Sequence, residues 1–374
     1  MAESRRRGGD LVMRVALVSA HYAPFAGGVE SHVEEIAKRL ADRGTSVEVL
    51  THHDDPDLPD TEKLDGVLVR RYKVAMTSQH FGLSPAVWSA LIRQRNQYDV
   101  IHVHGYHSAA PLTTDLAGVS PIVFTPHYHG TGHSPFRKAL HVPYRLVGKG
   151  LVARSARIIC VSQAEASLFL THFPAARARV RIIPNGADLE RINSALPFRN
   201  VGDVIVAGGR LHSYKQVDRI IDSMPLTPAT TRLVVTGDGP ERPRLESLAT
   251  ERNVADRVSF IGRVDTDTLY RWYATAQVFC SMSTNEAMPV TILELLAAGA
   301  RVTASDIPAH RDIRERTGGA IVLVPPDADP ATLAAALQVA YNKPGAPNQR
   351  IPTWDEVTTE TVEVYRDLVG TVAS

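Results

Sequence analysis

Net charge is nearly absent from this sequence of 374 residues, because 41 basic and 40 acidic side chains leave a formal charge of +1 at pH 7. Proteins that bind nucleic acids usually carry a clear basic excess. The balance therefore argues against a nucleic-acid partner, and it gives no attraction of the whole protein to an anionic membrane surface.

Cysteine and long apolar stretches are also scarce. The two cysteines, Cys160 and Cys280, lie in the apolar segments RIICVS and QVFCSM, so we expect buried thiols in a reducing compartment and no disulfide framework. The basic N-terminus precedes no long apolar segment, so no signal peptide is expected. No stretch reaches the roughly 18 apolar residues of a membrane helix. These absences predict a cytoplasmic protein.

Short apolar segments typical of strands alternate with longer helical patterns, in a chain whose 44% hydrophobic content can fill real cores. Residues 28–44 place apolar side chains at 3.6-residue spacing and end in a glycine. Unbroken apolar strands alternating with helices predict parallel sheets covered on both faces. The predicted strands cover residues 13–20, 46–51, 66–72, 98–105, 121–125, 157–162, 203–210, 231–238, 257–262, 277–282, 300–305 and 320–324.

The alternation restarts after residue 195, where the segment 191–203 has no period and contains proline and glycine. We therefore predict an α/β protein with one doubly wound domain over residues 13–195 and a second over residues 196–350. An amphipathic helix follows within residues 351–374. Ligands of such sheets bind beyond the carboxyl ends of the strands, so a ligand is expected in a cleft between the two domains.

Two glutamates eight positions apart stand out in the stretch SMSTNEAMPVTILELLAAGARV. Glu286 lies in a polar loop and Glu294 in the apolar helix that follows. A buried carboxylate needs hydrogen-bond donors, and a pair of sugar hydroxyls supplies two. The alternatives are that the stretch forms an ordinary solvated face and that the glutamate in the helix is bonded to a backbone group or an arginine. Pro289 is expected in the first turn of the helix, whose free N–H groups form an anion site.

Two cations and two pairs of glycines follow predicted strands. The strand at 203–210 ends in two glycines and Arg210, and Lys215 follows at the start of a helix. Fixed cations at a strand end suit a diphosphate, each worth up to about 4 kcal/mol per close charge pair at an effective dielectric near 20. Ordinary solvated charges are the alternative. Gly27 and Gly28 precede a helix and let backbone approach a ligand, or form a plain tight turn.

Histidines follow the strand at 121–125, and the question they raise is whether a metal binds. His127 suits a hydrogen bond to a substrate hydroxyl or carbonyl, and together with His129 and His133 it has the spacing of a metal cluster, but no carboxylate partner is evident. His102 and His104 share one face of a strand, and we expect them in the core or behind the site.

Two Asp-x-Asp strings and one basic segment have simpler explanations. Residues 265–267 predict a helix N-cap and residues 327–329 a turn, so no metal site is predicted. The basic segment 136–157 is interrupted by proline and glycine. A solvated face is favoured there, with weak contact to a membrane surface or binding of an anionic acceptor as alternatives.

Taken in chain order, these motifs resemble the retaining glycosyltransferases of the GT-B class, family four (group 1 type), over nearly the whole chain. The series comprises GGVE at 27–30, His127, CVSQ at 160–163, IPNGAD at 183–188, GGRL with Lys215, GDGP at 237–240, the two glutamates, and a terminal helix from Trp354 to Tyr365.

The resemblance implies a GT-B fold, with two Rossmann-like domains facing across a cleft and the terminal helix returning to the first domain. It also implies catalytic roles. Arg210 and Lys215 neutralise the nucleotide diphosphate, Glu286 binds hydroxyls of the donor sugar, and His127 contacts that sugar near the reacting centre. Glu294 binds the ribose, and Arg263 and Val264 flank the base. The implied donor-binding residues are Gly27, Gly28, Arg263, Val264, Ala287, Met288, Pro289, Val290 and Glu294.

The implied reaction moves a hexose from a nucleotide diphosphate sugar, with UDP or GDP as its carrier, to a hydroxyl of a small molecule, glycolipid or glycan. Configuration is retained by front-face displacement, with no metal and no cofactor. The sequence neither predicts nor excludes a homodimer. Ala287, Met288 and Pro289 depart from the usual E-G-F-G, and Gln216 stands where glycine is common. The rival interpretations are a nucleotide-sugar 2-epimerase of similar fold and an NAD-dependent oxidoreductase, which the missing dinucleotide fingerprint disfavours.

Overall fold

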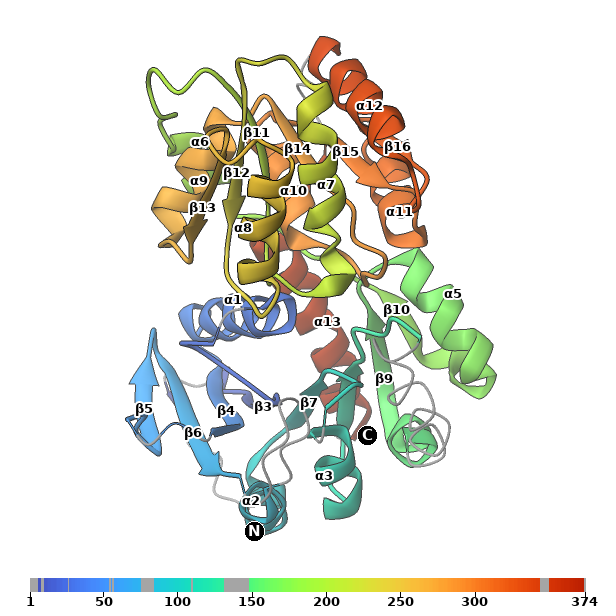
Figure 1. Cartoon of the computed structure of the whole chain (residues 1–374). Coiled ribbons are helices and arrows are strands. Elements are labelled where there is room, and N and C mark those ends of the chain that lie inside the picture. The colour runs from blue at the N-terminus through green and yellow to red at the C-terminus, as the bar shows by residue number, and fades with distance from the viewer. Residues whose placement is uncertain are drawn as a thin grey trace. The chain divides into compact units, whose positions relative to one another are not determined.

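The computed structural model describes residues 6–7, 10–25, 27–53, 55, 57–74, 84–108, 110–130, 148–343 and 350–372. The chain forms two compact units (Figure 1). Unit 1 comprises Met1–Asn185 and Trp354–Ser374, and unit 2 comprises Gly186–Thr353. The boundary predicted after residue 195 lies inside unit 2. Helix α6 (Leu189–Ser194) packs there on α9 (Thr266–Thr275) and α10 (Val290–Ala297), and the aperiodic segment marks only the loop after α6.

Unit 1 is built on an eight-stranded sheet in the order β10-β9-β8-β7-β3-β4-β6-β5, parallel except for the edge strand β5. The predicted strands of this half are present, whereas β5 and β10 were not predicted. A separate pair joins β1 (Arg6–Arg7) to β2 (Asp10–Leu11). The sheet strands are β3 (Arg14–Val18), β4 (Ser46–His53), β5 (Thr61–Leu64), β6 (Val67–Lys73), β7 (Val100–His104), β8 (Ile122–Thr125), β9 (Ser155–Cys160) and β10 (Val180–Ile182).

Helices cover the sheet of unit 1, and the first of them has the predicted limits. Helix α1 (Gly28–Asp42) buries Val33, Ile36 and Leu40 against the sheet, and Gly44 follows it with φ 83°. The other helical segments of unit 1 are α2 (Pro85–Gln94), η1 (Arg95–Gln97), α3 (Ala110–Ala117), α5 (Gln163–His172), η2 (Pro174–Arg179) and α13 (Trp354–Val372).

The terminal helix α13 belongs to unit 1, as predicted, where it packs on α1 and β7. Trp354 and Tyr365 are both buried. At its start, Asp355 accepts a hydrogen bond from Arg43, the C-cap of α1, with Nη2 and Oδ1 3.1 Å apart. A helix from the end of the chain therefore completes the unit that the beginning of the chain starts.

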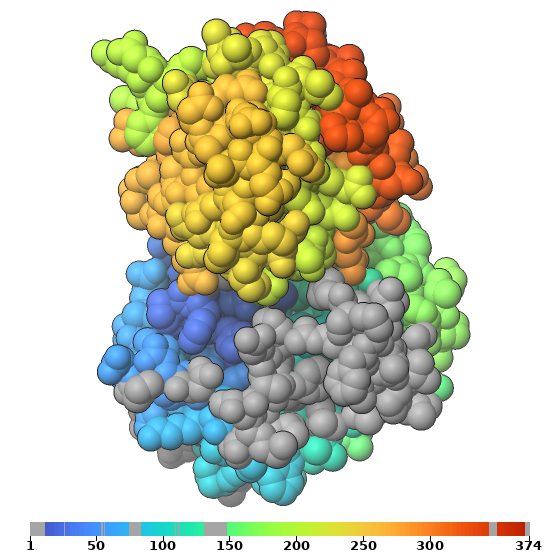
Figure 2. Space-filling view, in the orientation of Figure 1, coloured from blue at the N-terminus to red at the C-terminus, as the bar shows by residue number. Residues whose placement is uncertain are grey.

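Unit 2 is built on a six-stranded, all-parallel sheet in the order β13-β12-β11-β14-β15-β16. Helices lie on both faces of this sheet, and α8 lies over the face seen in Figures 1 and 2. The strands are β11 (Asp203–Gly208), β12 (Thr231–Thr236), β13 (Val258–Gly262), β14 (Val278–Ser281), β15 (Arg301–Ser305) and β16 (Ile321–Val324). The further helical segments are η3 (Ser213–Lys215), α7 (Val217–Ser223), η4 (Met224–Leu226), α8 (Arg242–Glu251), α11 (Pro308–Arg316) and α12 (Pro330–Asn342).

Each unit has its own apolar core, which includes one of the two cysteines. Both thiols are free and buried, as predicted, and burial raises their pKa. Within the residues that the structure describes, no helix combines the length and hydropathy needed to cross a bilayer. Of the basic segment 136–157, residues up to 147 lie outside that description, as does His133, and Arg154 pairs with Asp115.

Candidate functional site

In unit 2 the predicted residues gather at one edge of the sheet. Arg210 and Lys215 follow β11, Arg263 follows β13, and Glu286 follows β14. These strands are parallel, with β14 next to β11 and β13 separated from β11 by β12. Because parallel strands end at the same edge, their following loops meet there, as the sequence predicted for a ligand-binding edge.

The closest contact at this edge joins Lys215 to Glu286. Nζ of Lys215 donates to Oε1 of Glu286 at 2.6 Å, and both side chains are largely buried. Burial alone would raise the pKa of Glu286, but the adjacent ammonium holds it below its usual value. Burial likewise opposes the charge of Lys215, whereas Glu286 raises its pKa overall. Both groups are therefore ionised at neutral pH and compensate each other.

Arg210, like Arg263, is a cation of this edge without a partner among the described residues. It is exposed, and among the described residues its side chain has no hydrogen bond or ion pair. It lies close enough to Lys215 for its positive charge to oppose that of the lysine. An anion bound here would meet one free guanidinium and one ammonium already shared with a carboxylate.

Close backbone packing fixes the loop that carries Arg210. A Cβ on Gly208 would lie 2.0 Å from Oγ1 of Thr236, and one on Gly237 would lie 2.1 Å from the carbonyl oxygen of Gly209. The loops after β11 and β12 are also joined by a hydrogen bond from Leu211 N to Asp238 O at 2.9 Å. The GDGP motif thus has a structural role, because its first glycine lets the neighbouring strand-end loop pack against it.

Gln216, which ends the short helix carrying Lys215, has a left-handed backbone with φ 46° and ψ 45°. Glycine adopts this conformation without steric cost, whereas another L-residue there is strained by about 1 kcal/mol or more. Gln216 therefore stands at a position whose backbone geometry favours glycine, the residue common there in the family pattern.

Glu294 lies on α10 and is half-buried, not fully buried as expected. The hydroxyl of Tyr270, on α9, donates to its Oε1 at 3.0 Å. Pro289 is the N-cap of α10, one position before the first turn in which it was predicted, and it carries no N–H. The amides that open the helix belong to Val290 and Thr291, whose N–H groups precede the intrahelical ladder. Ala287 and Met288 lie in the loop before it.

The residues that follow β13 comprise two predicted donor-binding residues and a helix cap. Arg263 is exposed and Val264 half-buried. Asp265 caps α9 by accepting from Thr268 N at 2.9 Å, which confirms the predicted N-cap. Asp329 caps α12 in the same way, where a turn was predicted, and Asp267 pairs with Arg191. Three of the four aspartates of the two Asp-x-Asp strings are thus engaged in local structure.

In unit 1, Gly27 and Gly28 lie at the start of α1, where Gly27 is the N-cap. A Cβ added at Gly28 would meet no heavy atom within 4 Å among the described residues. Its φ is not in the left-handed region, and Gly27 is extended with φ 178°. The fold itself therefore does not demand glycine at Gly28.

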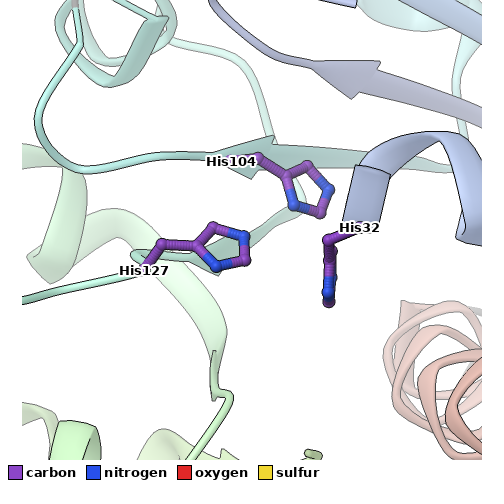
Figure 3. Close-up of side chains that lie close together, drawn as sticks. All are labelled: His32, His104 and His127. Carbon is purple, nitrogen blue, oxygen red and sulfur yellow. The ribbon is translucent and has the colours of Figure 1, made fainter. Parts of the chain in front are cut away.

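Three histidines converge at the strand edge of unit 1: His32 from α1, His104 from the end of β7, and His127 after β8 (Figure 3). Each offers a ring nitrogen, and these atoms all lie within 4.8 Å of one another. All three are buried. Burial lowers the pKa of each ring, that of His32 to about 4, so the rings are neutral at neutral pH.

The backbone at His127 is strained and held by a buried carboxylate. His127 has φ 47°, a left-handed conformation that is uncommon outside glycine. Glu165 accepts hydrogen bonds from the amides of the next residue, Tyr128, and of Val161, the latter at 2.5 Å. Burial, opposed by these two bonds, raises the pKa of Glu165 to about 7. The carboxyl group thus ties the loop after β8 to the end of β9.

A second layer of side chains lies behind the three histidines. Asn185, of the IPNGAD motif, has its Oδ1 2.8 Å from Nδ1 of His32. His102, as expected, is a core residue whose Nδ1 lies 2.6 Å from the hydroxyl of Tyr365. Its ring lies against that of His104, tilted by 38°, with centroids 4.0 Å apart. Trp354 meets the ring of His32 edge-on at 5.7 Å.

Sequence reasoning singled out His127 as a site residue but did not single out His32 and His104, which lie beside it. His32 was counted only as part of a helical pattern, and His104 only as a residue of a strand face. The sequence did contain a signal for their convergence. His104 ends β7, His127 follows β8, and His32 lies on the helix after β3, and these three strands are neighbours. The predicted catalytic residues are divided between the units, with His127 in unit 1 and Arg210, Lys215 and Glu286 in unit 2.

Comparison with known families matches both halves of the chain. Residues 26–191 match the family described as Glycosyltransferase Family 4, and residues 202–343 match Glycosyl transferases group 1. A D-inositol 3-phosphate glycosyltransferase of Kribbella flavida is 31% identical over 340 residues, covering 79% of this chain and 80% of that protein. One of Jonesia denitrificans is 29% identical over 416 residues, covering 94% and 95%. The epimerase and oxidoreductase interpretations are not favoured by these matches.

Solved structures confirm the predicted GT-B fold class. Sucrose-phosphate synthase from Thermosynechococcus elongatus superposes with a TM-score of 0.77 at 23% identity, covering 97% of this chain and all of that one (100%). Anabaena Alr3699/HepE, solved in complex with UDP-glucose, gives a TM-score of 0.71 at 19% identity, covering 96% and 99%.

Proposed function

This chain belongs to the group 1 glycosyltransferases of glycosyltransferase family 4, and we propose that it is a retaining, metal-independent hexosyltransferase that uses a nucleotide diphosphate sugar. The observation that carries the proposal is the pairing of Lys215 with Glu286 beside the unpaired Arg210 at the strand edge of unit 2. A diphosphate needs fixed cations, and a sugar needs a group that accepts hydrogen bonds from its hydroxyls. Lys215 supplies the first and Glu286 the second.

Donor binding separates the charges of this pair. The diphosphate competes with Glu286 for Lys215 and also meets Arg210. Glu286, released from Lys215, accepts hydrogen bonds from hydroxyls of the donor sugar, since a carboxylate accepts several donors. The amides at the start of α10 add further stabilisation to the anion. Glu294 takes the ribose hydroxyls, with Tyr270 supporting its carboxylate.

Transfer then depends on stabilising the leaving diphosphate. The bond from C1 of the sugar to the phosphate oxygen breaks, and a bond from C1 to the acceptor oxygen forms on the same face. The acceptor proton passes to a donor phosphate oxygen, so the products are the glycoside and the nucleoside diphosphate. Arg210 and Lys215 stabilise the charge that develops on the leaving group. His127 contacts the donor sugar beside the reacting carbon, and Gly28 leaves room for close approach.

The proposal of metal independence rests on two observations: cationic side chains lie where a metal ion would neutralise the diphosphate, and three of the four aspartates of the Asp-x-Asp strings are engaged elsewhere. Arg210 and Lys215 supply positive charge where a divalent ion would otherwise neutralise the diphosphate. The Asp-x-Asp strings cap α9 and α12 with Asp265 and Asp329, and Asp267 pairs with Arg191.

We propose UDP or GDP as the nucleotide carrier and a hydroxyl of a small molecule, glycolipid or glycan as the acceptor. A structural neighbour solved in complex with UDP-glucose supports UDP first, and the D-inositol 3-phosphate glycosyltransferases among the relatives make D-inositol 3-phosphate the first acceptor to test. The cytoplasm is the proposed location.

Thermal-shift titration with UDP-, GDP-, ADP- and TDP-linked hexoses tests the donor. One donor should raise the melting temperature, and Arg210→Ala should reduce that shift. Proton NMR of the glycoside formed from the stabilising donor then gives the anomeric configuration. An inverted product, or conversion of the donor to an epimer with no acceptor present, would contradict the proposal.

A further inference from the structure

The cluster of His32, His104 and His127 has a feature that sugar binding by His127 alone does not explain. Its ring nitrogens come from three separate elements and point toward one another (Figure 3). They lie within 4.8 Å of one another, and each side chain is more than nine-tenths buried. Within the described part of the chain, this is the one group of metal-ligating side chains brought so close together.

The nitrogens that face the cluster have no partner among the described residues. Nε2 of His32, both nitrogens of His104 and Nε2 of His127 are buried without a hydrogen bond. A buried polar group without a partner costs roughly 1–3 kcal/mol. Three such groups at one point indicate that a ligand satisfies them together.

The second layer prepares one of these rings, that of His32, as a ligand. Nδ1 of His32 faces the amide oxygen of Asn185 at 2.8 Å. Since that oxygen only accepts, Nδ1 carries the proton and the lone pair of Nε2 points to the cluster. A hydrogen bond from the remote ring nitrogen to an oxygen is the usual support of a metal-bound histidine.

We propose that His32, His104 and His127 bind one divalent transition-metal ion of the Zn²⁺ type, with water or an anion as fourth ligand. Neutral imidazoles suit zinc, cobalt, nickel and copper, whereas magnesium and calcium prefer oxygen ligands. Three histidines with one open position form a known zinc geometry. Nitrogens about 2.0–2.1 Å from a tetrahedral ion lie roughly 3.4 Å apart, so the rings close in by roughly 1 Å or more.

Occupation of this site inhibits the enzyme, a consequence that rests on the proposed function. A metal-bound imidazole has its lone pair engaged, and the ring of His127 can no longer serve the donor sugar. The metal proposed here is therefore a regulator of a reaction that needs none.

Cobalt provides the direct test, because four-coordinate Co²⁺ absorbs visible light more strongly than the hydrated ion. Tag-free protein stripped with EDTA is titrated with Co²⁺. One equivalent should bind with intense visible absorption, and Zn²⁺ should displace it. His32→Gln, His104→Gln and His127→Gln should each weaken binding at least about tenfold.

His53→Gln is the matched control, since His53 is another buried histidine of unit 1 outside the cluster. It should bind Co²⁺ as the wild type does. X-ray absorption of the zinc-loaded wild type adds a measurement that needs no variant and should show three imidazole nitrogens at about 2.0–2.1 Å. Absence of binding at millimolar Co²⁺, wild-type binding by all three variants, or a different ligand set overturns the site.

Turnover separates the two proposals. Zn²⁺ should inhibit sugar transfer, and EDTA should restore it. If the ion binds to the three histidines without inhibition, the metal site stands and the role of His127 at the donor sugar is wrong. If no ion binds while the enzyme transfers sugar normally, the metal site is wrong and the proposed function is unaffected.

Discussion

Nζ of Lys215 donates to Oε1 of Glu286 across 2.6 Å, although the two residues are 71 positions apart. Strand order explains the contact, because β11 and β14 are neighbours in the sheet of unit 2. The loops that follow them are also joined by Thr284 N and Tyr214 O at 2.8 Å. The pair is thus fixed by the topology of the sheet, and each member limits the other's access to a ligand.

Lys215→Ala should lower kcat by roughly 10²–10³-fold, the usual effect of removing one group that stabilises developing charge. Nucleotide release under steady-state conditions measures it. Lys38→Ala is the control, because Lys38 is half-exposed and its nearest carboxylate oxygen lies at 3.7 Å, and its kcat should be unchanged. Wild-type turnover by Lys215→Ala would remove this residue from the site.

Glu294→Ala should weaken donor binding about tenfold or more, because the ribose loses a carboxylate hydrogen-bond acceptor worth about 1.5–3 kcal/mol. Calorimetry with the donor and with the nucleoside diphosphate measures it, and both affinities should fall together. Tyr270→Phe removes the neighbouring hydroxyl and keeps the carboxylate, so affinity should change by less than about threefold. A loss confined to the Tyr270 variant would show that the hydroxyl of Tyr270, and not the carboxylate of Glu294, contributes to donor binding.

Glu165 should make stability depend on pH. Its pKa is raised by burial from 4.5 to about 7 in the folded protein, so the folded state holds this proton more tightly than the unfolded state. The contribution is complete below about pH 4.5 and is lost as the pH rises through 7, a change of about 3 kcal/mol.

Urea unfolding of wild type and Glu165→Gln between pH 4.5 and 8 measures this contribution. The wild-type free energy of unfolding should fall relative to the variant as pH rises. Glu251→Gln, at an exposed position of α8, should show a constant difference from the wild type. A Glu165→Gln difference that is flat or of opposite slope would mean that the two backbone hydrogen bonds keep the carboxylate ionised.

Gln216→Gly should stabilise the protein by up to about 1 kcal/mol, because the left-handed strain at φ 46° disappears. The buried Oε1 of Gln216, which has no partner among the described residues, is removed as well. Thermal unfolding measures the gain. Asn253→Gly is the control at φ 55°, where asparagine already tolerates the conformation, and its effect should be near zero or unfavourable. Destabilisation by Gln216→Gly would show that interactions of this side chain stabilise the protein by more than the backbone strain costs.

Tyr365→Phe should destabilise the protein by about 1–3 kcal/mol, because Nδ1 of buried His102 loses the phenol 2.6 Å away. Chemical denaturation measures it. Tyr341→Phe is the control, since its hydroxyl bonds Asp203 on the surface, and it should change stability by less than about 0.5 kcal/mol. Equal effects of the two substitutions would contradict a stabilising hydrogen bond between Tyr365 and His102.

The architecture was accessible from the sequence because buried parallel strands and amphipathic helices have distinct periods. Residues 28–44 illustrate this, since both the apolar face of α1 and the glycine after it are as predicted. The edge strand β5, with alternating half-exposed side chains, and the short β10 lack an apolar run and were missed.

The site was predictable only in its separate parts. Strand-end positions placed Arg210, Lys215 and Glu286 correctly at one edge, but the ion pair depends on side-chain geometry that spacing does not encode. Convergence of His32 with His104 and His127 likewise depends on strand order, which places β3 between β4 and β7. The roles of these residues toward a donor stay predictions.

The return of α13 to unit 1 has a consequence for biosynthesis. Unit 1 draws its strands and first helices from residues 6–185 but its covering helix from Trp354–Val372. A ribosome that has released residues up to 353 has delivered every strand and helix of unit 2, while β7 and α1 still lack their partner. The later unit can therefore finish folding first, and a premature stop before Trp354 would leave His102 and His32 of the earlier unit open to water.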